Sequence, residues 1–268
     1  MIGVFDSGLG GLSVLTAIAA ALPRADLLYL ADSAHVPYGD KPDSFITGRV
    51  LAIGQHLADQ GCTLLVVACN TATTAAIQAL RDHLPGIPVV GVEPGVKPAA
   101  EASRSHHIAV LTTESTARSQ RLAELIERHA AGTRVDIVPC PGWATHVETL
   151  QADTPEFLDE IAAKINPLVA AGVDRLVLGC THYAFLAPLI APRLRGQAEL
   201  VDVAAAVARQ VVRLGGEHAD GQGQLVLQAT ARPERLYAAL PALGLHALAL
   251  RSGPAQPVST PLPPPGRG

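Results

Sequence analysis

Short apolar runs alternate with longer segments rich in alanine and leucine along most of the chain. Each apolar run is predicted to be a buried strand: residues 2–5, 27–31, 64–68, 88–92, 108–111, 135–138, 176–179 and 199–202. Helices are predicted between them, including residues 10–22, 45–60, 71–83, 115–129 and 185–194. Strands this uniformly apolar are typical of parallel sheets covered by helices on both faces, so we expect an α/β fold. The 268 residues suffice for one large or two small domains.

The strand–helix pattern restarts near residue 108. The string IGVFDS, from Ile2, resembles IAVLTT, from Ile108, and the string VVACNT, from Val66, resembles VLGCTH, from Val177. The members of the two pairs lie 106 and 111 residues apart. These similar offsets indicate two related α/β halves.

The composition argues against several classes of protein. The net charge of −4 and the pI of about 6.2 are unlike those of nucleic-acid-binding proteins, which usually carry a basic surface. No apolar run approaches the roughly 18 residues that suggest a membrane span, and the first residues lack the features of a secretory signal. The four cysteines form no C-x-x-C pair, which favours free thiols in a reducing cytoplasm over a disulfide scaffold or structural zinc. Residues 252–268 are rich in proline, glycine and serine and are predicted to be a disordered tail.

Three polar clusters directly follow predicted strands: Asp6-Ser7-Gly8, Cys69-Asn70-Thr71 and Cys180-Thr181-His182. In open α/β sheets, ligands bind beyond the carboxyl ends of the strands. Each of the two cysteines also precedes a predicted helix, whose free N–H groups and dipole favour an anion or a substrate carboxylate. We therefore expect the pKa of both thiols to lie below the usual value of about 8.5.

A structural alternative exists for each of these residues. A cysteine at a strand end is often a small buried hydrophobe, and Cys62 and Cys140, in a turn and between prolines, fit that interpretation. Cys69 and Cys180 stand at matching positions of the two halves, each before polar residues, which favours a joint function. Asp6 can satisfy a turn, but a carboxylate at the end of a buried strand is costly unless it has a function.

Cofactor motifs are missing from the sequence. The GLGG segment that begins at Gly8 lacks both common phosphate-binding patterns, so a nucleotide is not expected. None of the three lysines has a context typical of a pyridoxal Schiff base, with Lys97, in the segment GVKP, left open as an alternative, and no metal-ligand spacing is visible. We expect no cofactor and no metal. In the polar loop of residues 32–42, Tyr38 can either complete a turn or cover a cleft.

Taken in order, these segments resemble the glutamate racemases, cofactor-independent isomerases of the aspartate/glutamate racemase superfamily. The resemblance rests on FDSGLGGL, PYG, ACNTATT, GVEPGVKPA and LGCTHY and runs from Ile2 to about residue 250; FDSG separates the chain from the aspartate racemases. It implies two similar parallel-sheet α/β domains related by pseudo-twofold symmetry, with the active site between them. The implied domains are residues 1–94 with 206–251, and residues 95–205. It also implies a cytoplasmic enzyme that can form a homodimer. The enzyme would supply D-glutamate for peptidoglycan and so for the cell wall and cell shape.

The resemblance assigns roles to residues by motif. Cys69 and Cys180 are implied to be the catalytic acid–base pair, with Asp6 assisting Cys69, and with His182 and Glu148, in the segment HVETL, assisting Cys180. The implied substrate contacts are Asp6, Ser7, Tyr38, Gly39, Asn70, Thr71, Thr181 and His182.

Three segments depart from the family pattern. Leu122 stands where a tyrosine is usual, Cys140-Pro-Gly-Trp143 replaces Cys-Pro-Leu-Phe, and Asp202-Val203 replaces Asp-Ser. We expect these positions on packing surfaces of the second domain, where they affect dimer contacts and regulation more than the chemistry.

Inversion at Cα requires a base on one face and an acid on the other, and two thiols meet this need. Three alternatives remain open. One is a racemase or isomerase of the same superfamily that acts on aspartate, hydantoins or maleate-like acids. Another is a binding protein without turnover, such as a regulator that contacts DNA gyrase, although intact Cys69 and Cys180 count against it. A cysteine hydrolase is a weaker option, because it needs only one of the two cysteines.

Overall fold

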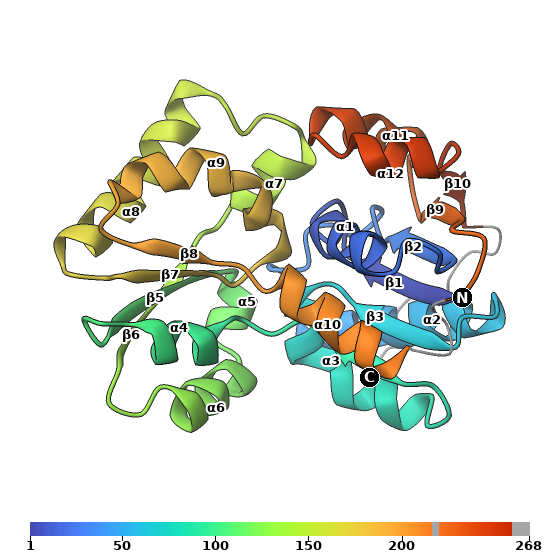
Figure 1. Ribbon diagram of the computed structural model, residues 1–268, viewed down its shortest axis with the longest axis horizontal. Helices are drawn as coiled ribbons and strands as arrows, with labels where there is room; N and C mark the ends of the chain where they lie inside the picture. The colour runs from blue at the N-terminus through green and yellow to red at the C-terminus, as the bar shows by residue number, and fades with distance from the viewer. Residues whose placement is uncertain (216–219, 259–268) are drawn as a thin grey trace.

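Two parallel β-sheets with helices on their faces make up the computed structural model, which describes residues 1–215 and 220–258 (Figure 1). The strands of the first sheet are β1 (Ile2–Asp6), β2 (Leu27–Ala31), β3 (Leu64–Val67), β4 (Val89–Gly91), β9 (Leu225–Ala229) and β10 (Gln256–Pro257). Those of the second sheet are β5 (His107–Thr112), β6 (Arg134–Pro139), β7 (Arg175–Leu178) and β8 (Glu199–Val201). The predicted α/β class is confirmed.

Four neighbouring strands of the first sheet have the same topology as the four strands of the second. The first has the order β10-β9-β2-β1-β3-β4 and the second the order β6-β5-β7-β8, with parallel pairing throughout. The run β2-β1-β3-β4 therefore has the same order as β6-β5-β7-β8, as the repeated strings predict. In each sheet the next two strands along the chain lie on opposite sides of the first strand, β1 or β5. Open α/β sheets bind ligands at such a switch point.

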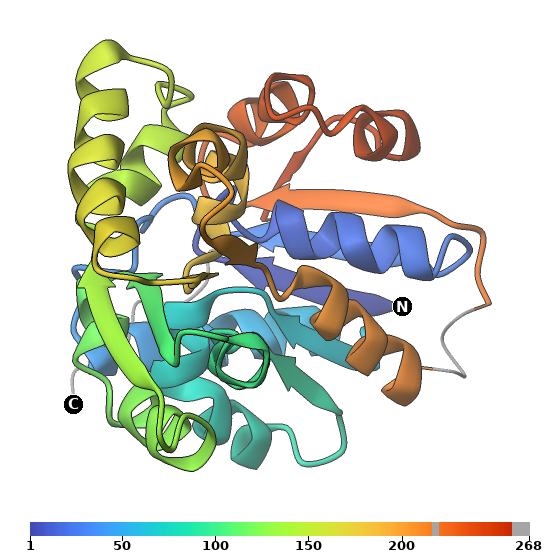
Figure 2. The same ribbon diagram turned by 60° about the vertical axis from the view of Figure 1, so that its left-hand side comes forward.

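Helices from distant parts of the chain surround the first sheet. They are α1 (Leu12–Ala21), α2 (Asp43–Asp59), α3 (Asn70–His83), α10 (Ala204–Leu214), α11 (Pro233–Ala242) and α12 (His246–Arg251). Figures 1 and 2 show α10 beside α1, and the two helices are in contact. The chain thus returns to the first half after it has completed the second.

The second sheet carries its own set of helices. They are α4 (Val96–Ala102), α5 (Glu114–Ala117), α6 (Gln120–His129), α7 (Trp143–Glu148), α8 (Pro155–Ala170) and α9 (Ala187–Ile190), with the 3₁₀ turns η1 (Thr181–Leu186) and η2 (Ala191–Leu194). None of the helices within residues 1–215 and 220–258 combines the length and the apolar character needed to cross a bilayer.

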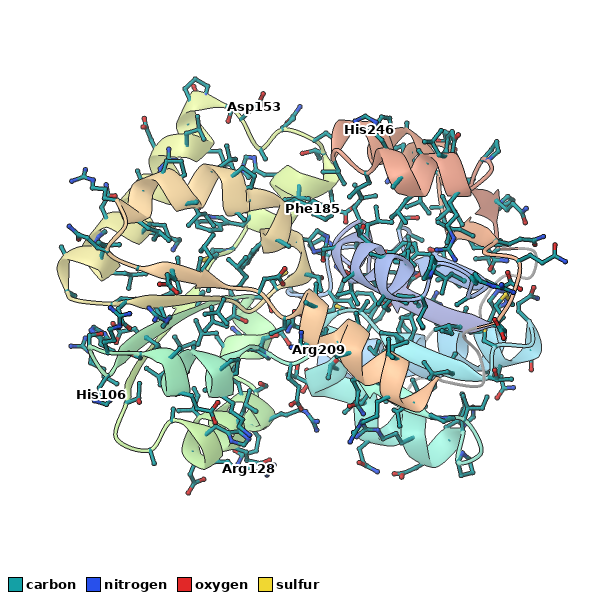
Figure 3. The ribbon with its side chains drawn as sticks, viewed as in Figure 1. His106, Arg128, Asp153, Phe185, Arg209 and His246 are labelled. Carbon is teal, nitrogen blue, oxygen red and sulfur yellow. The ribbon has the colours of Figure 1, made fainter. Side chains whose placement is uncertain are left out.

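Each sheet has an apolar core on both faces, and two side chains, Phe185 and Leu243, pack against cores of both halves. Phe185 packs against the core formed by α1, α10 and the first sheet and also against the core that contains Trp143 and Tyr183. Figure 3 shows Phe185 between the two halves. The two segments that connect the halves, near Gly95 and near Val203, also contact each other. A Cβ on Gly95 would lie 2.9 Å from Val201 Cγ1 and 3.0 Å from Val203 Cγ1. These contacts hold the halves against each other.

Two of the predicted helices are broken in the structure. Residues 185–194 form parts of η1, α9 and η2, because Pro188 and Pro192 lack the N–H group that a continuous helix needs. Residues 115–129 divide into α5 and α6, and Ser119 caps the second by accepting a hydrogen bond from Leu122 N at 3.2 Å.

Part of the predicted disordered tail is ordered. The strand β10 pairs in parallel with β9, and Val258 N donates to Ala229 O at 3.1 Å. The prediction is therefore wrong for residues 252–258, because an available sheet edge stabilises a segment whose composition suggests disorder. Residues 259–268 lie outside the described residues. The division into residues 1–94 with 206–251 and residues 95–205 remains a proposal, supported by the two separate sheets.

Candidate active site

The polar clusters predicted at strand ends meet where the two halves face each other. Asp6 ends β1, Cys69 follows β3, and Cys180 follows β7. Thr181 Oγ1 donates to Asp6 Oδ2 at 3.4 Å, which links the end of the second sheet to the end of the first. The side chains of Cys69 and Cys180 are 5% and 6% exposed. Both cysteines are thus buried where the two halves meet.

Cys69 is the N-terminal cap of α3. Its Sγ accepts a hydrogen bond from Ala72 N at 3.5 Å and lies 4.0 Å from Ser7 Oγ. Burial raises the pKa of this thiol well above its ordinary value, and the negative charge of Asp6 raises it further. The expectation of a lowered pKa is wrong for Cys69, because these two effects outweigh the helix N–H group.

Cys180 begins a chain of three polar side chains. Its Sγ lies 3.7 Å from His182 Nδ1, and His182 Nε2 lies 2.6 Å from Glu148 Oε1 on α7. Burial alone would lower the pKa of His182, but the hydrogen bonds with Cys180 and Glu148 outweigh it, and the pKa is raised well above its ordinary value. The environment therefore favours the protonated imidazole.

Asp6 lies fully buried beneath the loop that joins β1 to α1. Its carboxylate accepts hydrogen bonds from Ser7 N, at 2.7 Å, and from Gly11 N. Burial raises the pKa of Asp6, and the charge of His182 opposes that rise. A Cβ on Gly11 would lie 2.6 Å from Asp6 Cβ, so the loop can approach the carboxylate only with glycine at this position.

The side chain of Tyr38 already has a partner, which narrows its possible role. The hydroxyl donates to Asp32 Oδ2 at 2.6 Å, and the residue is 1% exposed. The next residue reaches the other half, because Gly39 O accepts a hydrogen bond from Ser115 N at 3.2 Å. Any contact of this turn with a substrate would therefore use the main chain rather than the Tyr38 hydroxyl.

Asn70 and Thr71 open α3 at the same cleft. Thr71 Oγ1 lies 3.1 Å from Thr113 Oγ1 and 3.4 Å from Thr116 Oγ1, two hydroxyls of the second half. Asn70 is 3% exposed, and its Nδ2 donor has no hydrogen-bond partner. A buried donor without an acceptor is costly, and an acceptor supplied by a ligand would remove that cost.

Thr113 and Thr116 are missing from the sequence-based set of site residues. A signal for the first of them exists, because Thr113 occupies the position of Ser7 in the repeated strings IGVFDS and IAVLTT. Thr116 has no such counterpart, and only the approach of α5 to α3 brings it into the cleft.

Glu148 also closes the cleft from one side. Its Oε1 accepts a hydrogen bond from Leu9 N at 2.6 Å, and a Cβ on Gly8 would collide with the same oxygen. A cavity of about 530 Å³ lies beyond this contact, lined among others by Gly8, Leu9, Glu148, Arg232 and Arg235. Glu148 thus lies between His182 and this cavity.

The other two cysteines are buried in apolar clusters, where Cys140 Sγ donates to Val138 O at 3.4 Å. Cys62 and Cys140 are each 2% exposed, and burial raises their pKa values to about 11 and about 12. The interpretation of both as small buried hydrophobes is confirmed, and all four cysteines are free.

The departures from the family pattern mostly lie in the interior of the second half. Trp143 is fully buried against Phe157 and Tyr183, and Leu122 is 1% exposed in the core under α6. Val203 instead lies in the second segment that connects the halves. Within residues 1–215 and 220–258, no group of three or more His, Cys, Asp or Glu side chains is arranged to hold a metal ion.

Comparisons with known proteins agree on one family. The model of the family described as Asp/Glu/Hydantoin racemase matches residues 2–211. The glutamate racemase of Pseudomonas entomophila is 44% identical over 257 residues, which cover 94% of this chain and 97% of that protein. That of Ectopseudomonas mendocina is 48% identical over 217 residues, covering 81% and 82% of the two chains.

Solved structures give the same result. A glutamate racemase of Bacillus anthracis superposes with a TM-score of 0.84 at 28% identity, covering 98% of both chains. The Escherichia coli glutamate racemase, solved in complex with L-glutamate and the activator UDP-MurNAc-ala, superposes with a TM-score of 0.80 at 31% identity and covers 90% of this chain and 94% of that one.

Proposed function

The chain belongs to the Asp/Glu/Hydantoin racemase family, and from this premise we propose that it interconverts L- and D-glutamate by proton transfer between Cys69, Cys180 and Cα. Glutamate as the substrate is supported by relatives of 44% identity over nearly the whole chain and by the glutamate complex of the Escherichia coli enzyme. The enzyme is an isomerase, and the D-glutamate that it forms serves peptidoglycan synthesis.

One observation carries the mechanism: two buried thiols approach one cleft from opposite halves, each with polar partners of its own. Cys69 lies beside Asp6 and Ser7, whereas Cys180 lies beside His182 and, through it, Glu148. A base and an acid on opposite faces of Cα can invert its configuration without turning the substrate over. In one direction Cys69 takes the proton and Cys180 delivers one, and in the other direction the roles are exchanged.

The remaining site residues have roles in binding. The α-carboxylate of the substrate gains negative charge when Cα loses its proton, so hydrogen-bond donors placed around it stabilise the transition state. Asn70 Nδ2 is a buried donor that lacks an acceptor, and Thr71 and Thr181 place hydroxyls at the same cleft. Closure of the two halves excludes water, which strengthens these interactions.

The proposal extends to the setting of the enzyme. A reducing cytoplasm is supported by four cysteines that are all free. A homodimer, which the family resemblance implies, is checked by light scattering of the purified chain at several concentrations.

The two-thiol mechanism is tested with four cysteine variants. Cys69→Ala and Cys180→Ala should each lower racemisation of glutamate by about 10³-fold, because each removes a positioned acid or base. Cys62→Ala and Cys140→Ala are matched controls: they remove equally buried thiols that take no part in the proposed proton transfer, and they should lose stability rather than activity. A chiral assay with L-glutamate, D-glutamate and D-aspartate gives the rates and distinguishes glutamate from aspartate as the substrate.

Proton exchange separates the two thiols. In deuterated water, Cys69→Ser and Cys180→Ser should each exchange the α-proton of one enantiomer faster than that of the other, with opposite preferences in the two variants. NMR of α-proton loss measures this. Parent-like racemisation by both alanine variants would show that the two strand-end cysteines are structural.

A further inference from the structure

A buried ion pair next to the cleft has no part in the proposed proton transfer. Asp32, which follows β2, is fully buried, and its Oδ2 accepts hydrogen bonds from Tyr38 Oη at 2.6 Å and from Arg49 Nε at 2.9 Å. Its Oδ1 accepts from Arg49 Nη2 at 2.9 Å and from Thr230 Oγ1 at 2.8 Å, and His35 Nδ1 lies 3.1 Å away. Arg49 on α2 is itself 2% exposed.

Stability alone is a poor explanation for this pair. Removing two charges from water is costly, and packed apolar residues of similar volume often serve as well or better. Burial would raise the pKa of Asp32, but the hydrogen bonds and charge of Arg49 lower it, so both groups are ionised at neutral pH. A fully ionised, bidentate pair of this kind fixes direction as well as distance.

The group whose direction it fixes is the turn of Tyr38 and Gly39. The Tyr38 ring lies in the same apolar cluster as Cys69, with its hydroxyl bound to Asp32. On the other side of the turn, Gly39 O accepts from Ser115 N of the second half, and a Cβ on Gly39 would lie 2.9 Å from Thr113 Cβ. The Tyr38 hydroxyl thus anchors the turn to the ion pair, and Gly39 contacts the second half.

We propose that Asp32 and Arg49 are positioning residues for glutamate: they hold the Tyr38 side chain, and through it the main chain of Tyr38 and Gly39, in the conformation that receives a substrate carboxylate. The proposal rests on the racemase function proposed above. Asp32 is well placed for this role, because its own N–H donates to Asp6 O at 2.9 Å and so ties the network to the end of β1. Loss of the Asp32–Arg49 network should therefore weaken glutamate binding and leave the positions of the two thiols unchanged.

The test uses Tyr38→Phe and Asp32→Asn, alone and together. Tyr38→Phe keeps the ring and the ion pair but removes the hydroxyl that joins them, and it should raise the KM for glutamate about 10-fold, as expected for one hydrogen bond to a charged group. Asp32→Asn should raise KM by at least as much. In both variants kcat should stay within about threefold of the parent.

The double variant shows whether the two residues act through one contact. If they do, the KM of Tyr38→Phe with Asp32→Asn should equal that of the more affected single variant, because the shared interaction can be lost only once. Gln228→Leu is the matched control. It removes the buried partner of His56, 2.9 Å from His56 Nε2, so it should lower Tm and leave KM unchanged.

Each outcome decides between the alternatives. Unchanged KM values in both single variants, or KM effects that multiply in the double variant, would overturn the proposal. If Asp32→Asn fails to fold, Tyr38→Phe decides alone. Failure of the racemase function has a different signature: the parent protein itself would neither racemise glutamate nor bind it in calorimetry.

Discussion

The two proposed catalytic thiols have neighbours of opposite charge. Cys69 lies near a carboxylate, which together with burial raises the pKa of the thiol, whereas Cys180 lies near a protonated imidazole. The thiol form of Cys69 is therefore favoured in the closed cleft. A bound substrate brings an ammonium group, and a positive charge near Cys69 would lower its pKa again. Substrate binding and activation of this thiol are coupled in this way.

Glu148 should control the proton on His182. The carboxylate helps to raise the pKa of His182, so Glu148→Gln should lower that pKa toward its ordinary value. The imidazolium is then lost at a lower pH, and the alkaline limb of the kcat/KM profile should move to lower pH. A rate profile between about pH 6 and pH 10, with an NMR titration of His182, measures the shift.

Glu148→Gln should also lower the free energy of unfolding at low pH, because it removes a group that raises the pKa of His182. A raised histidine pKa stabilises the folded protein below the unfolded pKa of about 6.5, and this contribution is lost as pH rises through the folded value. Asp136→Asn is the control, because Asp136 pairs with His107 at 2.8 Å in the second sheet, outside the cleft. An alkaline limb that stays in place in Glu148→Gln would show that Glu148 does not act through His182.

The edge strand β10 makes a prediction about the carboxyl-terminal segment. Deleting residues 252–268 removes β10 and its hydrogen bond from Val258 N to Ala229 O, whereas deleting residues 259–268 leaves both. The longer deletion should cost about 1–2 kcal/mol more, the value of one or two hydrogen bonds. Thermal melting of the two truncated proteins measures the difference as a Tm lower by a few degrees. Equal Tm values would mean that β10 contributes nothing.

The elements that could be predicted from sequence are those that carry a local signal. Uniformly apolar runs mark β1, β3, β5 and β7 well, and polar residues directly after them mark the cleft. The strand β9 has no predicted counterpart, because its short run contains Gln228 and its place is set by pairing with β2, 198 residues earlier in the chain. Proline at positions 188 and 192 is visible in the sequence and could have prevented the prediction of a continuous helix.

Within the site, the predictable part is likewise local. Cys69 as a helix cap follows from its position after a strand, but the direction of its pKa shift depends on burial and on Asp6, which is brought near by the fold. The unsatisfied Asn70 donor and the Asp32–Arg49 pair also depend on how helices meet the sheet. No periodicity in the chain encodes those meetings.

Closure of the whole molecule should control access to the thiols. All four cysteines are buried, and contacts between the halves, such as Leu9 with Glu148 and Thr71 with Thr113, cover the cleft. The halves must part before a reagent or a substrate reaches Cys69 and Cys180. Iodoacetamide should therefore label these two slowly, and glutamate at ten times its Kd should slow that labelling about 10-fold by mass action.

Peptide mass spectrometry follows each cysteine separately. Cys62 serves as the internal control, since it is buried just before β3 beside Gly3, and its labelling requires unfolding of that core rather than parting of the halves. Labelling of all four at one common rate would contradict a cleft that opens independently of global unfolding.

The strand β9 is synthesised long after its neighbour β2, which affects folding during translation. β2 is complete at Ala31, but its neighbour β9 begins only at Leu225, after every strand of the second sheet has been translated. At about 5–20 residues per second, β2 waits roughly 10–40 s with one edge unpaired. The nascent second half, whose strands are contiguous in the chain, can finish first. An unpaired strand edge invites mispairing, so the period of translation is when the first half is most in need of a chaperone.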